Sequence, residues 1–576
     1  VQCVEEIGKY GGTWRRVAIG PTDTVISSRL SYTALVRYTA MGVDIVPHVA
    51  KKWEQNANAS EFTLYLRKGM KWSDGQPFNA DNIMFWYEDR LMNKELSPTV
   101  SSWLKIKGQP VVVEKVDDYT VKFKFADTYG LFIKILASAP GHEIPDAGCK
   151  HYLSQFHPKY AKKEDLDKKM ADAKFENWWS LFGNRNDWQN TERPHIWPWI
   201  MTKAPPNVPE IAERNPYFWA VDPKGNQLPY IDRIRWDVVE NVDMLNLKAV
   251  AGEIDLQFRS LGWVYYPLYV EYADKGGYRV WKWIQGEGSN CCLHFNLNHE
   301  DKGLRQLEEI KEFRQALSLA INRKQINEIA YQGLGTPRQA SVLPSVPYFK
   351  QSQADAYAQY DPKKANEMLD KIGLTARDEE GYRKRLDGQK LTINIEYVLM
   401  FGPWRDVVQM VCSDWKNVGI RAIPKEEARP LFSQRGEAGT LQDMSVWTMD
   451  RSAHFLVEPY YQLPRRAGTP ASVGALYWDW YTTDGKQGEK PPAEVMKAYT
   501  LYEQCKTAKT EAELAQYATE LLDLNAEQIW FIGIVGILPA IGVVSKKLGN
   551  VPEKAVYDWL CLSSGNSYNE QFYFKS

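Results

Sequence analysis

Residues whose types and spacing could support catalysis are few in this sequence of 576 residues. The motifs G-x-S-x-G, G-x-x-x-x-G-K-[ST], H-E-x-x-H and G-x-G-x-x-G are absent, so no nucleophile elbow, P-loop, zincin helix or dinucleotide fingerprint is present. His294 and His299 lie five residues apart, which in a strand places them on opposite faces and disfavours joint metal ligation. The carboxylates are scattered, and the sequence singles out no acid–base pair among them. We therefore expect no catalytic residue, no metal site and no cofactor.

The seven cysteines support neither a disulfide scaffold nor a zinc knuckle, because their number is odd and no C-x-x-C pair occurs. Vicinal Cys291 and Cys292 point to opposite faces of a strand, which disfavours a bond between them. Cys3 could carry a lipid, although Val1 and Gln2 are not the small residues expected before a lipidated cysteine. The chain opens without a basic and apolar leader, so we expect no signal peptide in it.

Charge and composition describe an ordinary globular chain with one exception. Lys and Arg number 71 against 72 Asp and Glu, and this balance gives no field to attract nucleic acid. The longest apolar run, residues 529–544, is interrupted by glycine and proline and falls short of the ~20 residues that span a bilayer. The exception is the 22 tryptophans, whose flat faces suit either large cores or stacking on sugar rings.

Strand and helix patterns alternate along the chain, so the sequence predicts an α/β fold. Residues 111–125 are typical of a hairpin, and residues 391–423 of a β-α-β unit. Asp81 is expected to cap a helix that runs through Trp86, and Thr510 to cap a helix over 511–524.

One segment closely resembles a family signature. Residues 66–78 read LRKGMKWSDGQPF and are followed by Ala80-Asp81-Asn82 and Phe85, as in the extracellular solute-binding proteins of family 5. These are the dipeptide-, oligopeptide-, nickel- and oligosaccharide-binding receptors of ABC importers. Further blocks of the family follow in order, among them residues 10–13 (YGGT), 228–232 (LPYID), 313–317 (FRQAL) and 360–362 (YDP). The resemblance spans essentially the whole chain.

The resemblance implies a two-lobed, periplasmic-binding-protein-like α/β fold of type II, with a hinge and a ligand cleft between the lobes. Lobe I would comprise residues 1–46, 200–283 and 536–576, with an inserted subdomain at 47–199, and lobe II would comprise residues 284–535. Residues 278–284 and 529–535 would be the crossover strands. Such closure buries a ligand between lobes.

The resemblance also bears on the ligand. Peptide-binding members use an aspartate in lobe II, within a block W/C-x-x-D-Y-x-x-P, for the amino terminus of the peptide. Asp450 matches that position, but Arg451 replaces the tyrosine and would partly neutralise the carboxylate. A purely structural Asp450–Arg451 pair is the alternative.

Other segments are more similar to the oligosaccharide-binding branch, namely residues 333–340, 401–406, 460–461 and 478–480. We therefore expect an oligosaccharide, with a peptide or peptide-like solute as the alternative. For each tryptophan among the expected contacts, a place in the core is the alternative. The candidate ligand contacts are Trp404, Trp447 and Trp480 as stacking platforms, and Asp450, Arg451 and Asn290 as polar groups.

The resemblance implies an extracytoplasmic binding protein that works with the permease subunits of an ABC transporter in the membrane. A periplasmic or extracellular monomer is expected, free or tethered by lipid, with no nucleic-acid partner. The competing hypothesis is an exported glycoside hydrolase, which would release product where a binding protein only binds.

Overall fold

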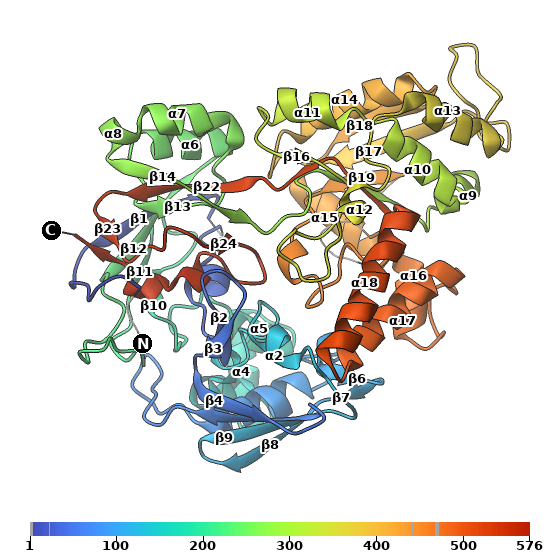
Figure 1. Ribbon diagram of the computed structural model, residues 1–576. Helices are drawn as coiled ribbons and strands as arrows, with labels where there is room; N and C mark the ends of the chain where they lie inside the picture. Colours follow the sequence, from blue (N-terminus) through green and yellow to red (C-terminus); the bar gives the residue numbers. More distant parts are fainter. Residues whose placement is uncertain (1–3, 22, 440–442, 467–471, 576) are drawn as a thin grey trace. The chain divides into compact units, whose positions relative to one another are not determined.

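The computed structural model describes residues 4–21, 23–439, 443–466 and 472–575 (Figure 1). The chain forms two compact units. Unit 1 takes in the chain up to Leu261, residues Tyr265–Trp283 and everything from Ala540 onward, and unit 2 takes in Gly262–Val264 and Ile284–Pro539. The chain therefore leaves unit 1 after Trp283 and returns after Pro539. The expected lobes divide at 283 and 535, and the expected insertion at 47–199 lies within unit 1; this domain scheme stays a prediction.

The first sheet of unit 1 has the order β1-β12-β11-β10. Its strands are β1 (Thr13–Ile19), β10 (Trp199–Lys203), β11 (Glu210–Arg214) and β12 (Arg233–Val239). β1 and β12 run parallel, and β11 is antiparallel to both neighbours, β12 and β10. Trp14, Arg16 and Ala18 alternate along β1 onto one buried face, as the two-residue period of a strand requires.

A second sheet of unit 1 has the order β13-β22-β14-β24. Its strands are β13 (Leu256–Gln257), β14 (Tyr278–Gln285), β22 (Pro539–Ser545) and β24 (Val556–Tyr557). One core cluster contains residues from both sheets, with Trp14, Trp199, Trp236 and Trp283 each 0–1% exposed. A large part of the tryptophan excess is therefore core, which was the simpler of the two explanations.

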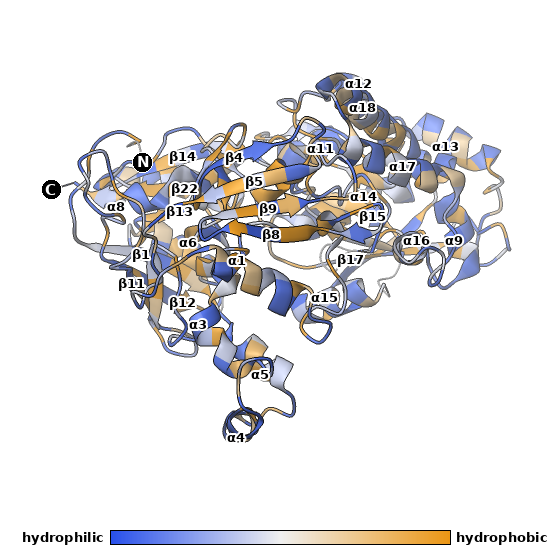
Figure 2. Cartoon of the chain, turned by 90° about the horizontal axis from the view of Figure 1, so that it is seen from below, coloured by the Kyte–Doolittle hydropathy of each residue, from blue (hydrophilic) through white to orange (hydrophobic). Residues whose placement is uncertain are grey.

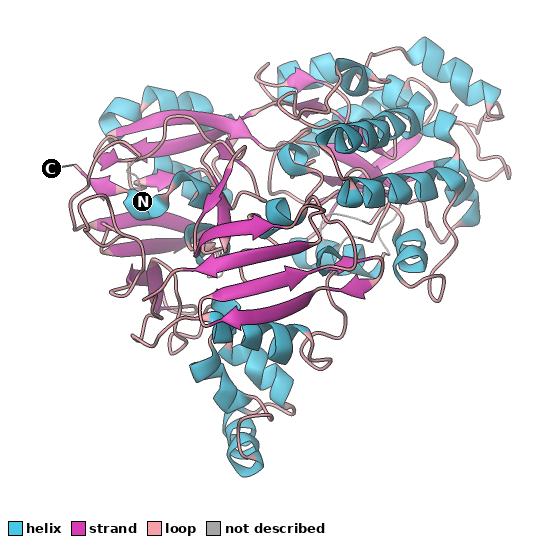
Figure 3. Cartoon of the chain, turned by 60° about the horizontal axis from the view of Figure 1, so that its bottom comes forward, coloured by secondary structure: helices cyan, strands magenta, loops and turns pink. Residues whose placement is uncertain are grey.

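The third sheet of unit 1 lies within the expected insertion and has the order β4-β5-β9-β8 (Figure 3). Its strands are β4 (Ala50–Gln55), β5 (Glu61–Leu66), β8 (Val112–Asp117) and β9 (Thr120–Lys124), and β8 and β9 confirm the predicted hairpin. The expected cap at Asp81 is wrong. Asn79 caps helix α1 (Ala80–Phe85) because its side chain accepts from the Asp81 N–H, while Asn82 Oδ1 accepts from the Asn79 N–H.

The remaining elements of unit 1 are short. The helices after α1 are α2 (Phe132–Leu136), α3 (Lys150–Leu153), α4 (Lys163–Ala173), α5 (Trp178–Arg185), α6 (Val242–Val250), α7 (Tyr266–Glu271) and α8 (Ala273–Gly276). The two-stranded pairs are β2 (Val36–Tyr38) with β3 (Ile45–Pro47), β6 (Lys105–Ile106) with β7 (Gln109–Pro110), and β23 (Leu548–Gly549) with β25 (Tyr573–Phe574). Helix α4 is polar along most of its length and buries Leu166 alone (Figure 2).

Unit 2 is built on a mixed sheet of order β18-β17-β19-β15-β20. Its strands are β15 (Cys292–Phe295), β17 (Thr392–Tyr397), β18 (Arg421–Glu426), β19 (Met444–Trp447) and β20 (Phe531–Gly533), and a separate pair joins β16 (Thr336–Pro337) to β21 (Val535–Gly536). β17 and β18 run parallel with helix α14 between them in the chain, which confirms the predicted β-α-β unit.

Ten helices of the described chain belong to unit 2. They are α9 (Lys302–Glu309), α10 (Lys311–Leu319), α11 (Arg323–Ala330), α12 (Gln351–Asp355), α13 (Pro362–Lys371), α14 (Trp404–Lys416), α15 (Arg429–Ala438), α16 (Ala475–Thr482), α17 (Ala493–Thr507) and α18 (Glu511–Gln528). Thr510 caps α18 as predicted, with its hydroxyl 3.1 Å from the Glu513 nitrogen. Across the described residues, none of the helices has the length and apolar character of a membrane span.

Candidate functional site

The expected contacts in unit 2 gather mainly at one edge of its sheet. β17 and β19 run parallel, so their carboxyl ends meet at the same edge, while the antiparallel β15 begins there. Cys292 pairs with Trp447 on one side and with Gly533 on the other, so β20 ends at this edge too. In open α/β sheets ligands bind outside the carboxyl ends of the strands.

Asn290 connects several segments at this edge through hydrogen bonds, and it is 3% exposed. Its Nδ2 donates to Glu287 Oε2 and to the Phe401 carbonyl, both at 3.1 Å. Its Oδ1 accepts from the Tyr331 hydroxyl at 3.1 Å, and its backbone N–H donates to the Val535 carbonyl at 2.8 Å. Because these hydrogen bonds engage its side chain, Asn290 orders the loop after β17.

Trp404 and Trp447 belong to an aromatic cluster with Phe401 and Phe432. The ring centroids of Trp404 and Trp447 lie 5.8 Å apart, Phe401 lies 5.4 Å from Trp447, and Phe432 stacks on Trp447 at 6.0 Å. Trp404 is 0% exposed, and its indole N–H already donates to the Asn290 carbonyl at 3.1 Å. Trp447 is 5% exposed. The structure thus gives both tryptophans the surroundings of core residues, whereas Phe401 keeps part of its surface.

Arg429 adds a cation to this cluster, and the sequence did not single it out. Its guanidinium carbon lies 4.4 Å from the centre of the Trp447 ring. Behind it on α15, Arg435 lies 2.8 Å from Glu396 and 2.5 Å from Glu427, two carboxylates that Lys425 also contacts at 3.0 Å. These ion pairs tie α15 to the carboxyl ends of β17 and β18.

Asp450 and Arg451 form a closed network directly after β19. Asp450 Oδ1 accepts from Arg451 Nη1 at 2.5 Å and from the Tyr461 hydroxyl at 2.6 Å. Arg451 Nε donates to Glu458 Oε2 at 2.6 Å. Arg451 takes a left-handed backbone conformation, with φ of 66°, which turns the chain sharply at this point. The guanidinium also lies 4.5 Å from the centre of the half-buried Tyr460 ring.

Burial alone would lower the pKa of Arg451, but Asp450 and Glu458 outweigh burial and raise that pKa well above its usual value. Burial, and then the Asp450 carboxylate, raise the pKa of Tyr461 in turn. Tyr461 therefore stays protonated, and its hydroxyl donates a hydrogen bond to Asp450. In this network the Asp450 carboxylate already accepts hydrogen bonds from both Arg451 and Tyr461.

Trp480 lies apart from these groups on helix α16. Its carbonyl accepts from the Gly485 N–H at 2.8 Å, and a Cβ at Gly485 would come within 3.3 Å of its indole nitrogen. The structure thus brings five of the six expected contacts to one edge and leaves Trp480 outside it. Phe401 lies in the segment 401–406 that the sequence analysis named, but it was not chosen as a contact. Arg429 and Tyr331 were missed because they come from separate segments, and no spacing in the sequence links them.

The two histidines singled out in the sequence have different surroundings. His294 packs edge-on against Phe531 at 5.2 Å, whereas His299 Nε2 lies 3.0 Å from Asp443 Oδ1. Burial raises the pKa of the Cys291 and Cys292 thiols, which keeps them protonated and unreactive. The sheet edge thus combines aromatic rings, an amide and ion pairs.

The family model described as bacterial extracellular solute-binding proteins, family 5 middle, matches residues 44–466. A periplasmic alpha-galactoside-binding protein of Rhizobium meliloti is 23% identical over 557 residues, covering 94% of this chain and 76% of the relative.

Two solved structures match over nearly the whole chain. An oligopeptide-binding protein OppA is 39% identical, with a TM-score of 0.74 and coverage of 100% of this chain and 92% of the other. The periplasmic binding protein MelB of Agrobacterium fabrum, in complex with stachyose, has a TM-score of 0.76 at 20% identity, covering 99% of this chain and 86% of the other.

Proposed function

The chain belongs to the bacterial extracellular solute-binding proteins of family 5, and from that premise we propose that it captures an oligosaccharide for an ABC importer. It would act outside the cytoplasm, as the relatives named periplasmic do, and deliver its solute to the permease subunits in the membrane. We propose a monomer without enzymatic activity. The lipid attachment considered at Cys3 falls outside the described residues.

The observation that carries the choice of solute is the state of Asp450. A carboxylate that receives the ammonium group of a peptide needs an oxygen directed at that group and no nearer cation. In this chain Arg451 and Tyr461 both donate to Asp450 Oδ1, at 2.5 and 2.6 Å. A second cation beside Asp450 would be repelled by the positive charge of Arg451, whereas an uncharged hydroxyl group would not be repelled.

The roles of individual side chains follow from their exposure. We propose Phe401 and Tyr460, which are half-buried, as the ring faces on which a sugar stacks. Trp404 and Trp447 would support them from the core, and Asn290 would hold the loop that carries Phe401. A relative named for binding alpha-galactosides and a related structure in complex with stachyose support a sugar ligand.

A peptide is the second candidate, and a specific observation favours it. The solved structure with 39% identity is named an oligopeptide-binding protein, and this identity is well above that of the sugar-binding relatives. The glycoside hydrolase considered from the sequence finds no support among the relatives, which are named for binding.

Thermal unfolding of the purified protein with and without stachyose, raffinose and a set of tripeptides tests the proposal. Binding stabilises the folded state by RT ln(1 + [L]/Kd), about 2.7 kcal/mol at a hundredfold excess over Kd. The proposal predicts a higher melting temperature with a sugar and no release of reducing ends on long incubation. Stabilisation by peptides alone would contradict it, and release of reducing ends would establish a hydrolase.

A further inference from the structure

Three arginines of unit 1 gather around Tyr557, in a region that the sequence did not single out. Arg16 lies on β1, Arg29 on the short π-helix Ile26–Leu30 that follows β1, and Arg259 just after β13. Tyr557, at the end of β24, lies near all three guanidinium groups, and the centre of its ring is 5.0 Å from the guanidinium carbon of Arg29. We call this set the arginine cluster.

Arg16 is 5% exposed, an unusual place for a guanidinium. Its Nη1 donates to the Leu256 carbonyl at 3.3 Å, and its guanidinium carbon lies 5.0 Å from the centre of the Trp14 ring. Its buried Nε has no hydrogen-bond partner among the described residues. Burial lowers the pKa of Arg16 to about 10, and Arg259 and Arg29 add to this shift while Tyr557 and Asp23 oppose it. Arg16 is still a cation at neutral pH.

Arg29 is 8% exposed and is held mainly by aromatic rings. Its guanidinium carbon lies 5.0 Å from the centre of the Tyr557 ring and 5.3 Å from that of Trp559. Its Nη1 donates to the Ser563 carbonyl at 2.6 Å, and its buried Nε, like that of Arg16, has no hydrogen-bond partner within the described chain. No carboxylate bonds directly to either of these two arginines among the described residues.

Arg259 is the one member with an ion-pair partner. Its Nε and Nη2 both donate to Asp23 Oδ1, at 2.8 and 2.5 Å. Its side chain keeps 24% of its surface exposed, and Tyr557 is also partly exposed. These two side chains are therefore the part of the arginine cluster that a solute can reach.

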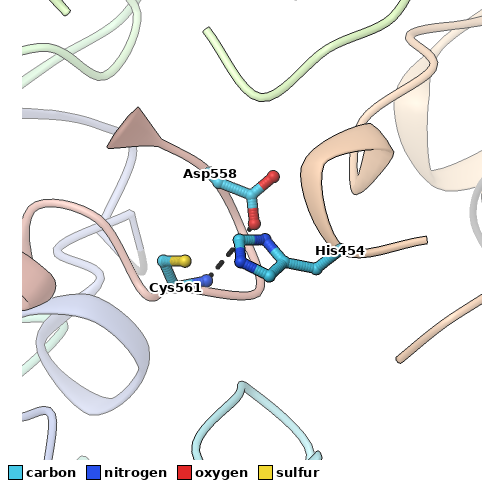
Figure 4. Close-up of side chains that lie close together, drawn as sticks. All are labelled: His454, Asp558 and Cys561. Atoms are coloured by element: carbon cyan, nitrogen blue, oxygen red, sulfur yellow. Dashed lines mark hydrogen bonds between the residues drawn. The ribbon is translucent and has the colours of Figure 1, made fainter. Parts of the chain in front are cut away.

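The carboxylates around the cluster do not balance its three positive charges. Asp23 is the ion-pair partner of Arg259. Asp558, which acts electrostatically on Arg29, accepts a backbone hydrogen bond from Leu560 at 2.8 Å and one from Cys561 at 3.3 Å. Figure 4 shows the second of these bonds. The third carboxylate is Glu210, close enough to Asp23 for their charges to interact. Burial raises the pKa of Glu210 to about 7, so at neutral pH it carries only part of a charge.

A buried excess of positive charge is costly unless an anion compensates it. The geometry points to a solute that supplies this anion, and we propose that the arginine cluster of unit 1 is a subsite for a carboxylate group. The carboxylate would lie against Arg259 and Tyr557, with Arg16 and Arg29 behind them as positioning charges. This inference rests on the proposed function and narrows its solute to an acidic oligosaccharide, one that contains a uronic acid.

Calorimetry with two matched sugars tests the subsite. The probes are the α-1,4-linked trimer of galacturonic acid and the corresponding neutral trimer of galactose. Since hydrogen bonds to charged groups are the stronger class, we expect the acidic trimer to bind about tenfold more tightly or better at low salt. Arg259→Gln should remove this preference, and Arg259→Lys should retain part of it.

Arg233→Gln is the matched control, because Arg233 is also an arginine of unit 1 in an ion pair, 2.9 Å from Glu213. It lies outside the cluster, so the preference for the acidic trimer should survive this change. Equal affinity for the two trimers, or tighter binding of the neutral one, would overturn the subsite and leave the oligosaccharide proposal standing. A preference that persists in a folded Arg259→Gln protein would also overturn it.

A second pair of probes, a tripeptide and its C-terminal amide, separates the two proposals if neither sugar binds. If the wild-type protein prefers the free acid and Arg259→Gln abolishes that preference, the carboxylate subsite is retained and the oligosaccharide proposal is overturned. Equal binding of acid and amide, or no binding of any of the four probes, would overturn both.

Discussion

Single side chains in unit 1 show how burial changes chemistry. Glu210 is 0% exposed, and neither of its carboxylate oxygens has a hydrogen-bond partner among the described residues. It sits in register with Trp236, which in turn is in register with Arg16, so the three side chains form a row across β11, β12 and β1. Desolvation favours the neutral form of the acid and raises its pKa to about 7, above the ordinary value of 4.5.

A stability that depends on pH follows from this residue. The folded state holds the Glu210 proton more tightly than the unfolded state, so stability falls as pH rises from the unfolded pKa towards the folded one and is constant above it. We expect Glu210→Gln to stabilise the protein by about 3 kcal/mol near about pH 8 and by almost nothing near about pH 4. Urea unfolding of both proteins across this range measures the difference.

Glu213→Gln is the control, because Glu213 lies on the same strand with a side chain that is 47% exposed and paired with Arg233. An exposed pair is worth little, so this change should shift stability by less than about 1 kcal/mol at every pH. If Glu210→Gln were destabilising at high pH, the carboxylate would have a bonding role that contradicts our account.

Unit 2 illustrates at the residue scale what the sequence could and could not predict. Asp450 and Arg451 were expected as polar groups from their place in a family block, and the structure adds Tyr461 and Glu458 as their partners. The burial of Trp404 could not be foreseen, because the same residue type serves cores and ligand sites. It depends on neighbours more than a hundred residues away in sequence, such as Asn290, 114 positions earlier.

Elements were predicted best where their signals are local. The hairpin of β8 and β9, the β-α-β unit and the Thr510 cap each depend on residues within one segment, and each is confirmed. The start of α1 was misplaced by two residues, since Asn79 and Asp81 are both good caps and only the backbone geometry distinguishes them. The arginine cluster was missed because its members come from three separate elements, namely strand β1, the π-helix Ile26–Leu30 and the segment after β13.

The corrected cap of α1 gives a test at the scale of one element. Asn79→Ala removes one half of a capping box and should destabilise the protein by about 1 kcal/mol in urea unfolding. Asp81→Ala removes a first-turn carboxylate and its surface pair with Lys115, 2.8 Å away, and should cost less. A larger loss in Asp81→Ala than in Asn79→Ala would restore the cap expected from the sequence.

The chain path determines how the whole molecule can be divided. Unit 1 is completed only by the residues after Pro539, since β22 pairs with β13 and Val544, Leu548 and Phe572 lie in its main core cluster. Residues 540–575 are thus a structural part of unit 1, whose core and sheet they complete.

Truncation tests this dependence. A chain ending at Pro539 should leave unit 1 unfolded, because it loses a central strand and several fully buried side chains. Proteolysis followed by mass spectrometry should then find cleavage throughout residues 4–261. Addition of a peptide spanning 540–576 is the control, and recovery of resistance would show that the lost residues themselves are responsible. If residues 4–261 of the truncated chain resist proteolysis without the peptide, unit 1 folds without residues 540–576, and this would contradict our account.

The central claim is that the edge of the unit 2 sheet contacts uncharged hydroxyl groups of an oligosaccharide and no ammonium group. Calorimetry on Asp450→Asn tests it most directly. The measurement compares this variant with the wild-type protein, for one oligosaccharide and one tripeptide. Since Arg451 and Tyr461 already engage Asp450, we predict that the oligosaccharide binds and that the change costs no more than about 1.5 kcal/mol of binding free energy. Binding of the tripeptide alone, with a loss of roughly 3–5 kcal/mol in Asp450→Asn, would mean that Asp450 receives an ammonium group and would contradict the account.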